Sequence, residues 1–227
     1  MTKVVILCGG KGTRIGHETR YKPKPMIKID DKPIIWHVMK IFKHYGYNDF
    51  ILSAGYKNKM IKNFFKNSKE FNVKVVNTGI NTETGGRILL LKKYIKDKHF
   101  FMTYGDGISD VNIRKLFNYH LENKGIATLT AVRPPVRFGE IKFLNNKIKS
   151  FIEKPQTGSG WINGGFFVLN RKIFSFIKNK KIVFEREPLT KISQKKKLFG
   201  FKHLGFWHCM DTIRDKEILE KKLRKKN

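Results

Sequence analysis

Apolar and polar positions follow two different patterns along the first part of the chain. Short apolar, β-rich runs, the first ending in two glycines, are separated by stretches with an apolar position every three or four residues. The runs predict buried strands, and the stretches predict helices that pack on them. Strands separated by helices predict βαβ units and a mostly parallel sheet. We expect strands over residues 3–8, 50–54, 73–76, 99–104 and 126–132, and helices over 33–45, 59–66, 87–95 and 112–122.

The pattern changes after Pro134-Pro135, where short strands with tight connections follow one another and Asn145-Asn146 marks a hairpin turn. We expect strands over 140–143, 147–151 and 164–169, and helices over 171–177, 187–194 and 213–225. No repeat, Ser/Pro-rich linker or low-complexity block divides the chain. We therefore predict a single α/β domain over 1–227. Residues 1–133 form a Rossmann-like half, with a mixed, mostly parallel central sheet flanked by helices, and residues 134–227 form a smaller α+β half that closes over it.

Composition excludes a disordered chain and points to a strong positive charge. Hydrophobic residues make up 40% of the 227 residues, enough to build a core. Lys and Arg total 48 against 18 acids, a formal net charge of +30 that would attract any polyanion. The lysines are scattered, however, and the clusters at 195–197 and 221–226 are more typical of solvated helix faces. A specific nucleic-acid partner is not expected, although a basic nucleic-acid-binding protein is kept as a distant alternative.

The two cysteines, Cys8 and Cys209, cannot form the disulfide framework of a small secreted protein, so a reducing compartment is expected. The first apolar run is too short for a signal-peptide core, and no run approaches the length of a membrane span. We expect a cytoplasmic protein without membrane insertion.

A glycine-rich loop follows the first strand, with Gly9, Gly10 and Gly12 inside Leu7-Cys8-Gly9-Gly10-Lys11-Gly12-Thr13-Arg14. Glycines let backbone N–H groups approach and surround a phosphate, and Arg14 adds a bidentate donor. The spacing matches neither the dinucleotide fingerprint nor the Walker A motif. A plain glycine turn after a strand remains an alternative.

The segment Lys22-Pro23-Lys24-Pro25-Met26 comes next. Its prolines favour an extended backbone, so both lysines should project from the same side. The alternative is a surface loop stiffened by proline with two solvated lysines.

Two aspartates could hold a cation. Asp106 lies between Gly105 and Gly107 at the carboxyl end of an expected central strand, where ligands bind in open α/β sheets. Its oxygens suit a hard cation such as Mg²⁺, although an aspartate that stabilises a turn is equally compatible. Asp211 lies far downstream, before the last helix, where it could also be a helix cap.

Two other features of the sequence bear on the chemistry. Thr84-Gly85-Gly86-Arg87 opens a helix whose N-terminus favours an anion or a polar edge. None of the seven histidines has a partner at metal-site spacing, and Cys8 has no neighbouring base in the sequence, so it is expected to act as a small apolar residue.

In their order along the chain, these motifs resemble the sugar-1-phosphate nucleotidylyltransferase family, and within it the glucose-1-phosphate cytidylyltransferases. The supporting runs are Gly9–Arg14, Lys22–Met26, Lys32–His37, Thr84–Arg87, Tyr104–Gly107, Arg137–Gly139, Glu153–Pro155, Ile162–Phe167, Glu187–Leu189 and Met210–Thr212. The resemblance implies a GT-A-like nucleotidyltransferase fold. It also implies the condensation of CTP with glucose 1-phosphate to CDP-glucose and pyrophosphate, for the biosynthesis of nucleotide sugars and surface polysaccharides.

The resemblance also assigns roles. It implies that Arg14 and Lys24 are catalytic, and that Asp106 and Asp211 hold Mg²⁺. It implies a nucleotide site formed by Leu7, Cys8, Gly9, Gly10, Gly12, Thr13, Arg14, Lys24, Thr84, Gly85, Gly86 and Gly105. It implies a sugar-phosphate site in the second half, formed by Gly139, Glu153, Lys154 and Asn163.

The residue types fit this reaction. A sugar phosphate is already an adequate nucleophile, so the protein needs only to align the reactants in line and screen their charge. Lysine, arginine, glycine N–H groups and Mg²⁺ suffice for that.

Two departures from the family leave alternatives open. Cytidylyltransferases usually carry a longer insertion where residues 67–72 lie here, and their carboxyl end continues further. The same chemistry on another sugar 1-phosphate, or with another nucleotide, is therefore the main alternative, and a ligand sensor without turnover is a third. We expect a homo-oligomer.

Overall fold

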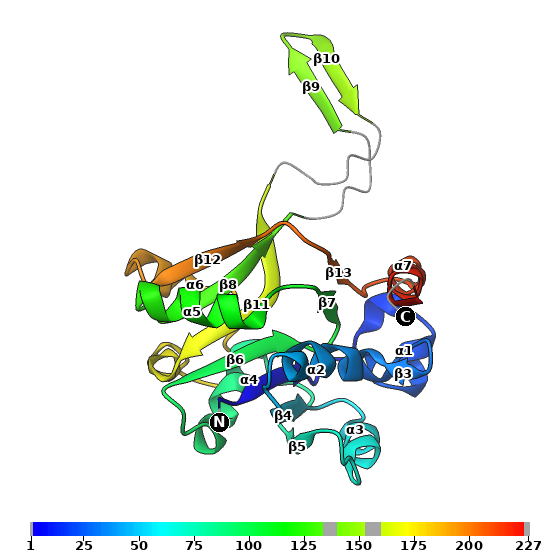
Figure 1. Ribbon diagram of the computed structural model, residues 1–227, viewed down its shortest axis with the longest axis vertical. Helices are drawn as coiled ribbons and strands as arrows, with labels where there is room; N and C mark the ends of the chain where they lie inside the picture. Colours follow the sequence, from blue (N-terminus) through cyan, green and yellow to red (C-terminus); the bar gives the residue numbers. More distant parts are fainter. Residues whose placement is uncertain (1, 134–139, 153–159, 225–227) are drawn as a thin grey trace.

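A seven-stranded sheet forms the centre of the protein, with the strand order β12-β8-β11-β6-β1-β4-β5 (Figure 1). The computed structural model describes residues 2–133, 140–152 and 160–224, without the side chains of Arg14, Glu140 and Lys142. Neighbouring strands of the sheet are parallel except where β11 pairs antiparallel with β6 and β8. The predicted mixed, mostly parallel sheet is thus confirmed. Its strands are β1 (Val4–Cys8), β4 (Asp49–Ala54), β5 (Asn72–Asn77), β6 (His99–Tyr104), β8 (Ala127–Val132), β11 (Ile162–Asn170) and β12 (Leu198–His203).

Helices cover both faces of the sheet because its central strands are apolar on both sides. Alternate residues of β1 point to opposite faces, Val4 and Ile6 into one cluster and Val5 and Leu7 into another. Helices α2, α3 and α5 contribute to the first cluster, and α4, η4 and α6 contribute to the second. The helices are α1 (Glu18–Tyr21), α2 (Ile34–His44), α3 (Asn58–Phe65), α4 (Thr84–Leu90), α5 (Ile113–Asn123), α6 (Glu187–Gln194) and α7 (Ile213–Arg224), with 3₁₀ helices η1 (Thr13–Ile15), η2 (Lys24–Met26), η3 (Lys92–Tyr94) and η4 (Arg171–Phe176).

A third apolar cluster joins the two ends of the chain. Ile27 and Ile29, around the small hairpin of β2 (Lys28–Ile29) and β3 (Lys32–Pro33), pack with Leu219 of α7 and with Met210. In the same region, β13 (Trp207–Cys209) pairs antiparallel with β7 (Gly107–Ser109), which directly follows the loop after β6. These contacts place the segment before α7 beside the segment that carries Lys24.

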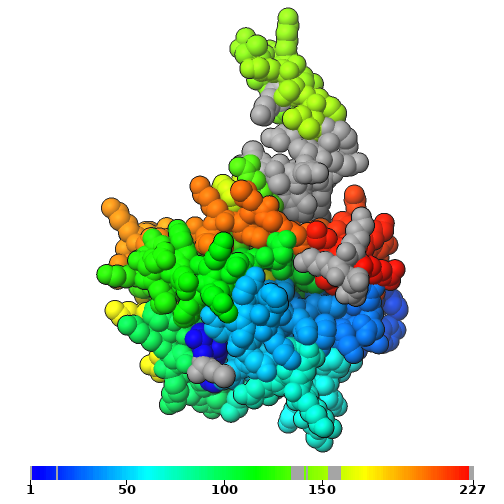
Figure 2. Space-filling model, in the orientation of Figure 1, coloured from blue at the N-terminus to red at the C-terminus, as the bar shows by residue number. Residues whose placement is uncertain are grey.

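A hairpin of β9 (Glu140–Leu144) and β10 (Lys147–Ile152) projects from the rest of the described structure (Figures 1 and 2). Its turn lies at the predicted position, and Asn145 has a positive φ of 54°. From residues 134–227, β11 and β12 join the sheet that β1, β4, β5, β6 and β8 form. Strands from both predicted halves therefore share one sheet.

Several elements differ from the expectations. Lys24–Met26, expected to be extended because of its prolines, forms the 3₁₀ helix η2, with Pro25 in its first turn. The helix expected over 87–95 starts earlier, at Thr84, and its last turns separate into the 3₁₀ helix η3. Residues 171–176 also form a 3₁₀ helix. Strands β7 and β13 are three residues each, and β12 is a half-exposed edge strand interrupted by Gly200, so none of these carries the apolar run of a buried strand.

Among the described residues, no helix is both long enough and apolar enough to cross a membrane.

Candidate active site

A cavity of about 560 Å³ opens at the carboxyl ends of β1 and β6. The two strands are parallel neighbours, so the loops that follow them meet at one edge of the sheet. The cavity is lined by Leu7, Cys8, Gly9, Gly10, Gly12, Lys24, Pro25, Ile80, Asn81, Thr82, Glu83, Thr84, Arg87, Tyr104, Gly105 and Asp106. Glycine N–H groups, cationic side chains and a carboxylate thus surround one cavity.

The glycine loop takes its shape from its neighbours. Gly12 has a positive φ of 67°, and a Cβ there would lie 2.5 Å from Cβ of Lys24. A Cβ on Gly9 would lie 1.9 Å from a guanidinium nitrogen of Arg87. Both positions therefore need glycine, one for its conformation and both for close approach.

Arg87 fixes the glycine loop through a hydrogen bond to its backbone. Its buried guanidinium donates to the carbonyl of Gly9 at 3.1 Å, to Oγ1 of Thr78 at 2.7 Å and to the carbonyl of Gly79 at 2.9 Å. Burial lowers the pKa of Arg87 from its usual value of 12.5, but the group stays charged. One side chain from α4 thus fixes two loops that line the cavity.

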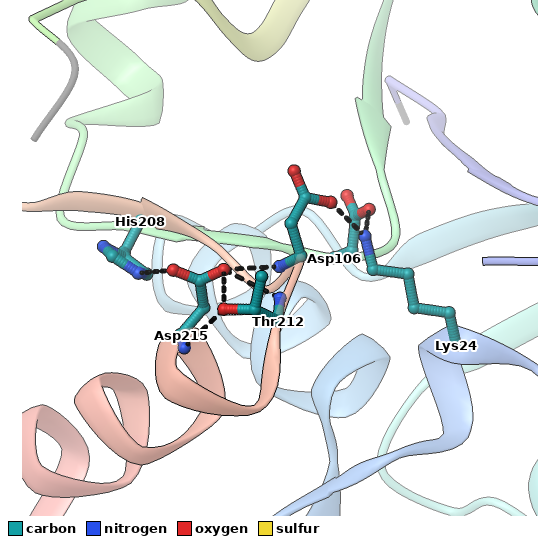
Figure 3. Close-up of polar contacts among 6 residues, drawn as sticks. Lys24, Asp106, His208, Thr212 and Asp215 are labelled. Carbon is teal, nitrogen blue, oxygen red and sulfur yellow. Dashed lines mark hydrogen bonds and ion pairs between the residues drawn. The ribbon is translucent and has the colours of Figure 1, made fainter. Parts of the chain in front are cut away.

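Lys24 lies between two carboxylates from distant parts of the chain (Figure 3). Its Nζ donates to Oδ2 of Asp106 at 2.6 Å and to Oδ1 of Asp211 at 2.7 Å. The exposed fraction of the side chain is only 8% for Lys24, 23% for Asp106 and 22% for Asp211. Burial alone would lower the pKa of Lys24, but the two carboxylates more than offset this, so its pKa is raised and the ammonium stays charged. The alternative of two solvated lysines is therefore wrong for Lys24.

The segment that carries Asp211 is held by Asp215 of α7. Oδ2 of Asp215 accepts from the backbone N–H of Asp211 at 3.1 Å and from the N–H and hydroxyl of Thr212, both at 2.8 Å (Figure 3). Its Oδ1 lies 2.9 Å from Nε2 of His208. Burial would raise the pKa of Asp215, but these donors outweigh it and lower the pKa. A charged, buried acceptor thus fixes the backbone next to Asp211.

Asp106, Asp211 and Cys209 form the one group of potential metal ligands found in the described part of the chain, with ligand atoms within 4.8 Å of one another. The ammonium of Lys24 shows that a cation is stable between the two aspartates. Their oxygens are the donors that a hard divalent cation prefers, whereas the sulfur of Cys209 suits softer metals. The carboxylate pair therefore fits a divalent metal.

A second cavity, of about 380 Å³, is lined by both of these carboxylates. It shares Tyr104 and Asp106 with the first cavity, and its other lining residues are Thr103, Gly107, Asn163, Gly164, Gly165, Glu185, Trp207, Cys209 and Asp211. Molecules in the two cavities would therefore lie next to each other at Tyr104 and Asp106.

The structure brings most of the predicted site residues together. The predicted residues Leu7, Cys8, Gly9, Gly10, Gly12, Lys24, Thr84, Gly105 and Asp106 line the first cavity, and Asn163 and Asp211 line the second with Asp106. Thr13 lies instead at a neighbouring depression with Lys11 and Arg20. Gly85 and Gly86 pack against the backbone of residues 180–182. Gly139, Glu153, Lys154 and the Arg14 side chain lie outside what the structure describes.

Cys8 is buried, and its thiol lies 3.4 Å from the carbonyl of Ser53. Burial raises the pKa of Cys8 to about 12, so the sulfur is a protonated thiol at neutral pH. This agrees with its interpretation as a small apolar residue.

Several residues of the site were not predicted to act there, among them Arg87, Glu185 and Asp215. Arg87 was visible only as the last residue of a helix-opening run. Glu185 lies among lysines and arginines, and Asp215 lies in a stretch of mixed charge, and both stretches resemble solvated surface. The spacing of Thr212 and Asp215 before the last helix matches a capping box, whereas no signal in the sequence separates Glu185 from the exposed charges around it.

The sheet carries a glycine-rich loop and a pair of carboxylates side by side. Enzymes that transfer nucleotides need such groups to bind phosphates and a metal, and the comparison with known families agrees with this class. The family model described as "Nucleotidyl transferase" matches residues 3–207. The chain belongs to this family, and more narrowly to the sugar-1-phosphate nucleotidylyltransferases, as the resemblance predicted.

Two relatives with high sequence identity align with nearly the whole chain. The glucose-1-phosphate cytidylyltransferase of Salmonella typhimurium is 42% identical over 242 residues, covering 96% of this chain and 94% of that protein. A probable glucose-1-phosphate cytidylyltransferase of Bacillus subtilis is 40% identical over 241 residues, with the same coverage. The first alignment has 242 positions against 227 residues here, so the Salmonella protein contains residues inside the aligned region that this chain lacks.

Solved structures share the fold. The structure of HddC from Yersinia pseudotuberculosis in complex with GMP-PN has a TM-score of 0.78 and 26% identity, covering 98% of this chain and all of that one. A putative glucose-1-phosphate thymidylyltransferase from Bacillus anthracis has a TM-score of 0.79 at 21% identity, covering 100% of this chain and 97% of that one. The second likeness concerns the fold alone.

Proposed function

We propose that the protein condenses CTP with glucose 1-phosphate to form CDP-glucose and pyrophosphate. The observation that carries the proposal is the position of Lys24. Its ammonium is fixed between Asp106, which lines both cavities, and Asp211, which lines the second. The identity of 42% and 40% to two cytidylyltransferases over almost the whole chain supports CTP and glucose 1-phosphate as the substrates.

The first cavity would hold the nucleotide. The N–H groups of the glycine loop would meet the phosphates that leave as pyrophosphate, with Arg14 as a further donor to them. Thr84 would meet the base at the opposite wall of the cavity. Gly85 and Gly86 would contribute through the close packing that places Thr84 there.

Lys24 would stabilise the charge that builds on the α-phosphate during in-line attack. The glycine loop and Pro25 enclose its side chain, so its ammonium is preorganised and needs little rearrangement when the charge develops. Asp106 and Asp211 would hold Mg²⁺, which supplies further neutralisation of phosphate charge.

The second cavity would hold the sugar 1-phosphate. Asn163 lines it, and the roles of Gly139, Glu153 and Lys154 at the sugar and its phosphate are carried by the family resemblance. The two cavities share Tyr104 and Asp106, so a sugar phosphate in the second cavity would lie next to a nucleotide in the first, as the reaction requires.

The main alternative is the same reaction with another nucleotide or sugar. A D-glycero-α-D-manno-heptose 1-phosphate guanylyltransferase of Aneurinibacillus thermoaerophilus is 32% identical over 206 residues, covering 88% of each chain. The fold and the carboxylate pair would serve that reaction equally well.

A cytoplasmic location, a homo-oligomer and a single domain with a boundary between its halves near residue 133 are parts of the same proposal.

The test is pyrophosphate release with Mg²⁺ in a matrix of the four nucleoside triphosphates and a panel of hexose 1-phosphates. We expect release with CTP and glucose 1-phosphate above every other pair. Preference for another pair would change the proposed substrates but not the type of reaction. No release with any pair would refute the proposal that the protein is a transferase. Lys24→Ala should lose most of the activity. The matched control is Lys22→Ala, two residues away, where the lysine pairs only with the surface residue Glu18 among the described residues.

A further inference from the structure

Glu185 lies on the boundary between the two cavities and contacts a wall of each. Its Oε2 accepts from the hydroxyl of Thr84 at 2.6 Å, and Thr84 lines the first cavity. Its Oε1 accepts from the hydroxyl of Tyr104, which lines both cavities. Glu185 itself lines the second cavity. One carboxylate therefore connects the proposed nucleotide wall with the proposed sugar wall.

The loop that carries Glu185 is fixed in place by the start of α4. The carbonyl of Lys180 accepts from Glu83 N at 3.1 Å, and the carbonyl of Ile182 accepts from Gly86 N at 3.3 Å. A Cβ on Gly86 would lie 2.3 Å from the Lys180 carbonyl, and one on Gly85 would lie 2.7 Å from the Ile182 carbonyl. The two glycines thus allow the loop to approach closely enough for Glu185 to reach Thr84.

Tyr104 is held as a hydrogen-bond donor to Glu185. Burial, and then the negative charge of Glu185, raise the pKa of the Tyr104 phenol, so it stays protonated. Asn163 lines the second cavity too, and its Oδ1 accepts from Gly165 N at 2.9 Å. This leaves Glu185 as a fixed acceptor with a donor at each oxygen.

We propose that Glu185 is a specificity-determining residue that accepts a hydrogen bond from a hydroxyl of the hexose in the second cavity. An ionised carboxylate offers about four acceptor positions, and Thr84 and Tyr104 use two of them. The others remain for a donor in the cavity that Glu185 lines. A carboxylate accepts and never donates, so it selects a sugar with a hydroxyl at the facing carbon and disfavours one without it. The inference rests on the proposed function, because it assumes a hexose 1-phosphate in this cavity.

The experiment measures binding without turnover, so that it does not depend on the transferase reaction. Affinities for glucose 1-phosphate and its 2-, 3-, 4- and 6-deoxy analogues are determined by calorimetry, in the presence of Mg²⁺ and a non-hydrolysable CTP analogue. The proteins are wild type, Glu185→Gln and the matched control Glu187→Gln. Glu187 lies two residues away on the exposed surface, where it pairs with Lys191.

We expect the wild type to bind one deoxy analogue about 10- to 100-fold more weakly than glucose 1-phosphate, the loss typical of one hydrogen bond to a charged group. Glu185→Gln should reduce that ratio to less than about threefold, and Glu187→Gln should leave it unchanged. Affinity for the CTP analogue should change far less than affinity for the sugar.

The inference is overturned if wild type discriminates against no deoxy analogue, a result that needs no variant to fold. It is also overturned if Glu185→Gln keeps the wild-type ratio of affinities for glucose 1-phosphate and the deoxy analogue. The same holds if this variant loses affinity for the CTP analogue and for all sugars to the same extent and its melting temperature falls as well. Preference for a hexose other than glucose would change the proposed function alone, because the deoxy series of that hexose gives the same comparison.

Discussion

Replacing Lys24 by methionine removes the charge between Asp106 and Asp211 and keeps most of the volume of the side chain. The ammonium now contacts both carboxylates, at 2.6 and 2.7 Å, and without it two negative groups with ligand atoms within 4.8 Å of each other face one another. At an effective dielectric constant near 20, two charges at that separation repel by about 3 kcal/mol. Lys24→Met should therefore be destabilised in the absence of divalent cations.

For a chain of this size, that repulsion corresponds to a fall in melting temperature of about 5–10 °C. Mg²⁺ should recover most of the loss, since it replaces the missing positive charge, whereas wild type should respond much less. Activity should fall by about 10²–10³-fold even with saturating Mg²⁺, because the preorganised charge at the α-phosphate is lost.

The assay is thermal unfolding with and without Mg²⁺, combined with initial rates of pyrophosphate release. Lys22→Met serves as the control and should match wild type in both. A Lys24→Met protein with wild-type rates would contradict the catalytic role. A variant whose melting temperature is unchanged and independent of Mg²⁺ would contradict the electrostatic account of the carboxylate pair.

Three further predictions concern residues around the site and in the core. Arg87→Lys should raise the KM for CTP by about 10-fold or more in initial-rate measurements, since lysine cannot bridge the loops that Arg87 joins; an unchanged KM would show that the glycine loop needs no such support. Asp215→Asn should lower affinity for Mg²⁺ in calorimetry, because Asp215 fixes the backbone at Asp211, and wild-type affinity would argue against that positioning. Burial lowers the pKa of His120 to about 4 from 6.5, so the unfolded state binds the proton first and stability should fall as pH drops from 6.5 to 4, by about 3 kcal/mol. His120→Gln should remove that slope from melting temperatures measured across this range, and a slope equal to that of wild type would assign it to other groups.

The elements that carry the site could be predicted because their signals are local. Strand β6 occupies the expected residues 99–104, and helix α6 the expected residues 187–194. The glycine loop and Asp106 follow buried apolar strands, and their positions at the carboxyl ends of β1 and β6 follow from parallel pairing. The resemblance to a known family then joined Lys24 and Asp211 to them.

The meeting of Lys24 with Asp211 could not be derived from the sequence pattern. The two residues are 187 positions apart, and α7 is held near Lys24 by the apolar cluster that Leu219 forms with Ile27 and Ile29. Isolated apolar residues of this kind give no periodic signal. Non-local packing of this type decides the tertiary contact, and no rule of local propensity contains it.

The role of Glu185 was hidden for a similar reason. It contacts Thr84 across 101 positions of sequence, from a loop that depends on the absence of side chains at Gly85 and Gly86. In the sequence, Thr84-Gly85-Gly86 predicted a helix N-terminus that favours an anion or a polar edge, and the resemblance placed it in the nucleotide site, but neither pointed to Glu185. The structure shows that the absence of side chains at these glycines lets a neighbouring loop pack closely against them. This contact depends on the neighbouring loop as much as on the Thr84-Gly85-Gly86 motif.

The measurement that tests the account most directly is phosphorus NMR of a reaction containing the protein, CTP, glucose 1-phosphate and Mg²⁺. The account predicts that CTP disappears while CDP-glucose and pyrophosphate appear in equal amounts, and that Lys24→Ala abolishes this conversion while Lys22→Ala does not. CTP that stays intact, or that is hydrolysed without incorporation of the sugar phosphate, would contradict the claim that Lys24, Asp106 and Asp211 join two substrates from two adjacent cavities.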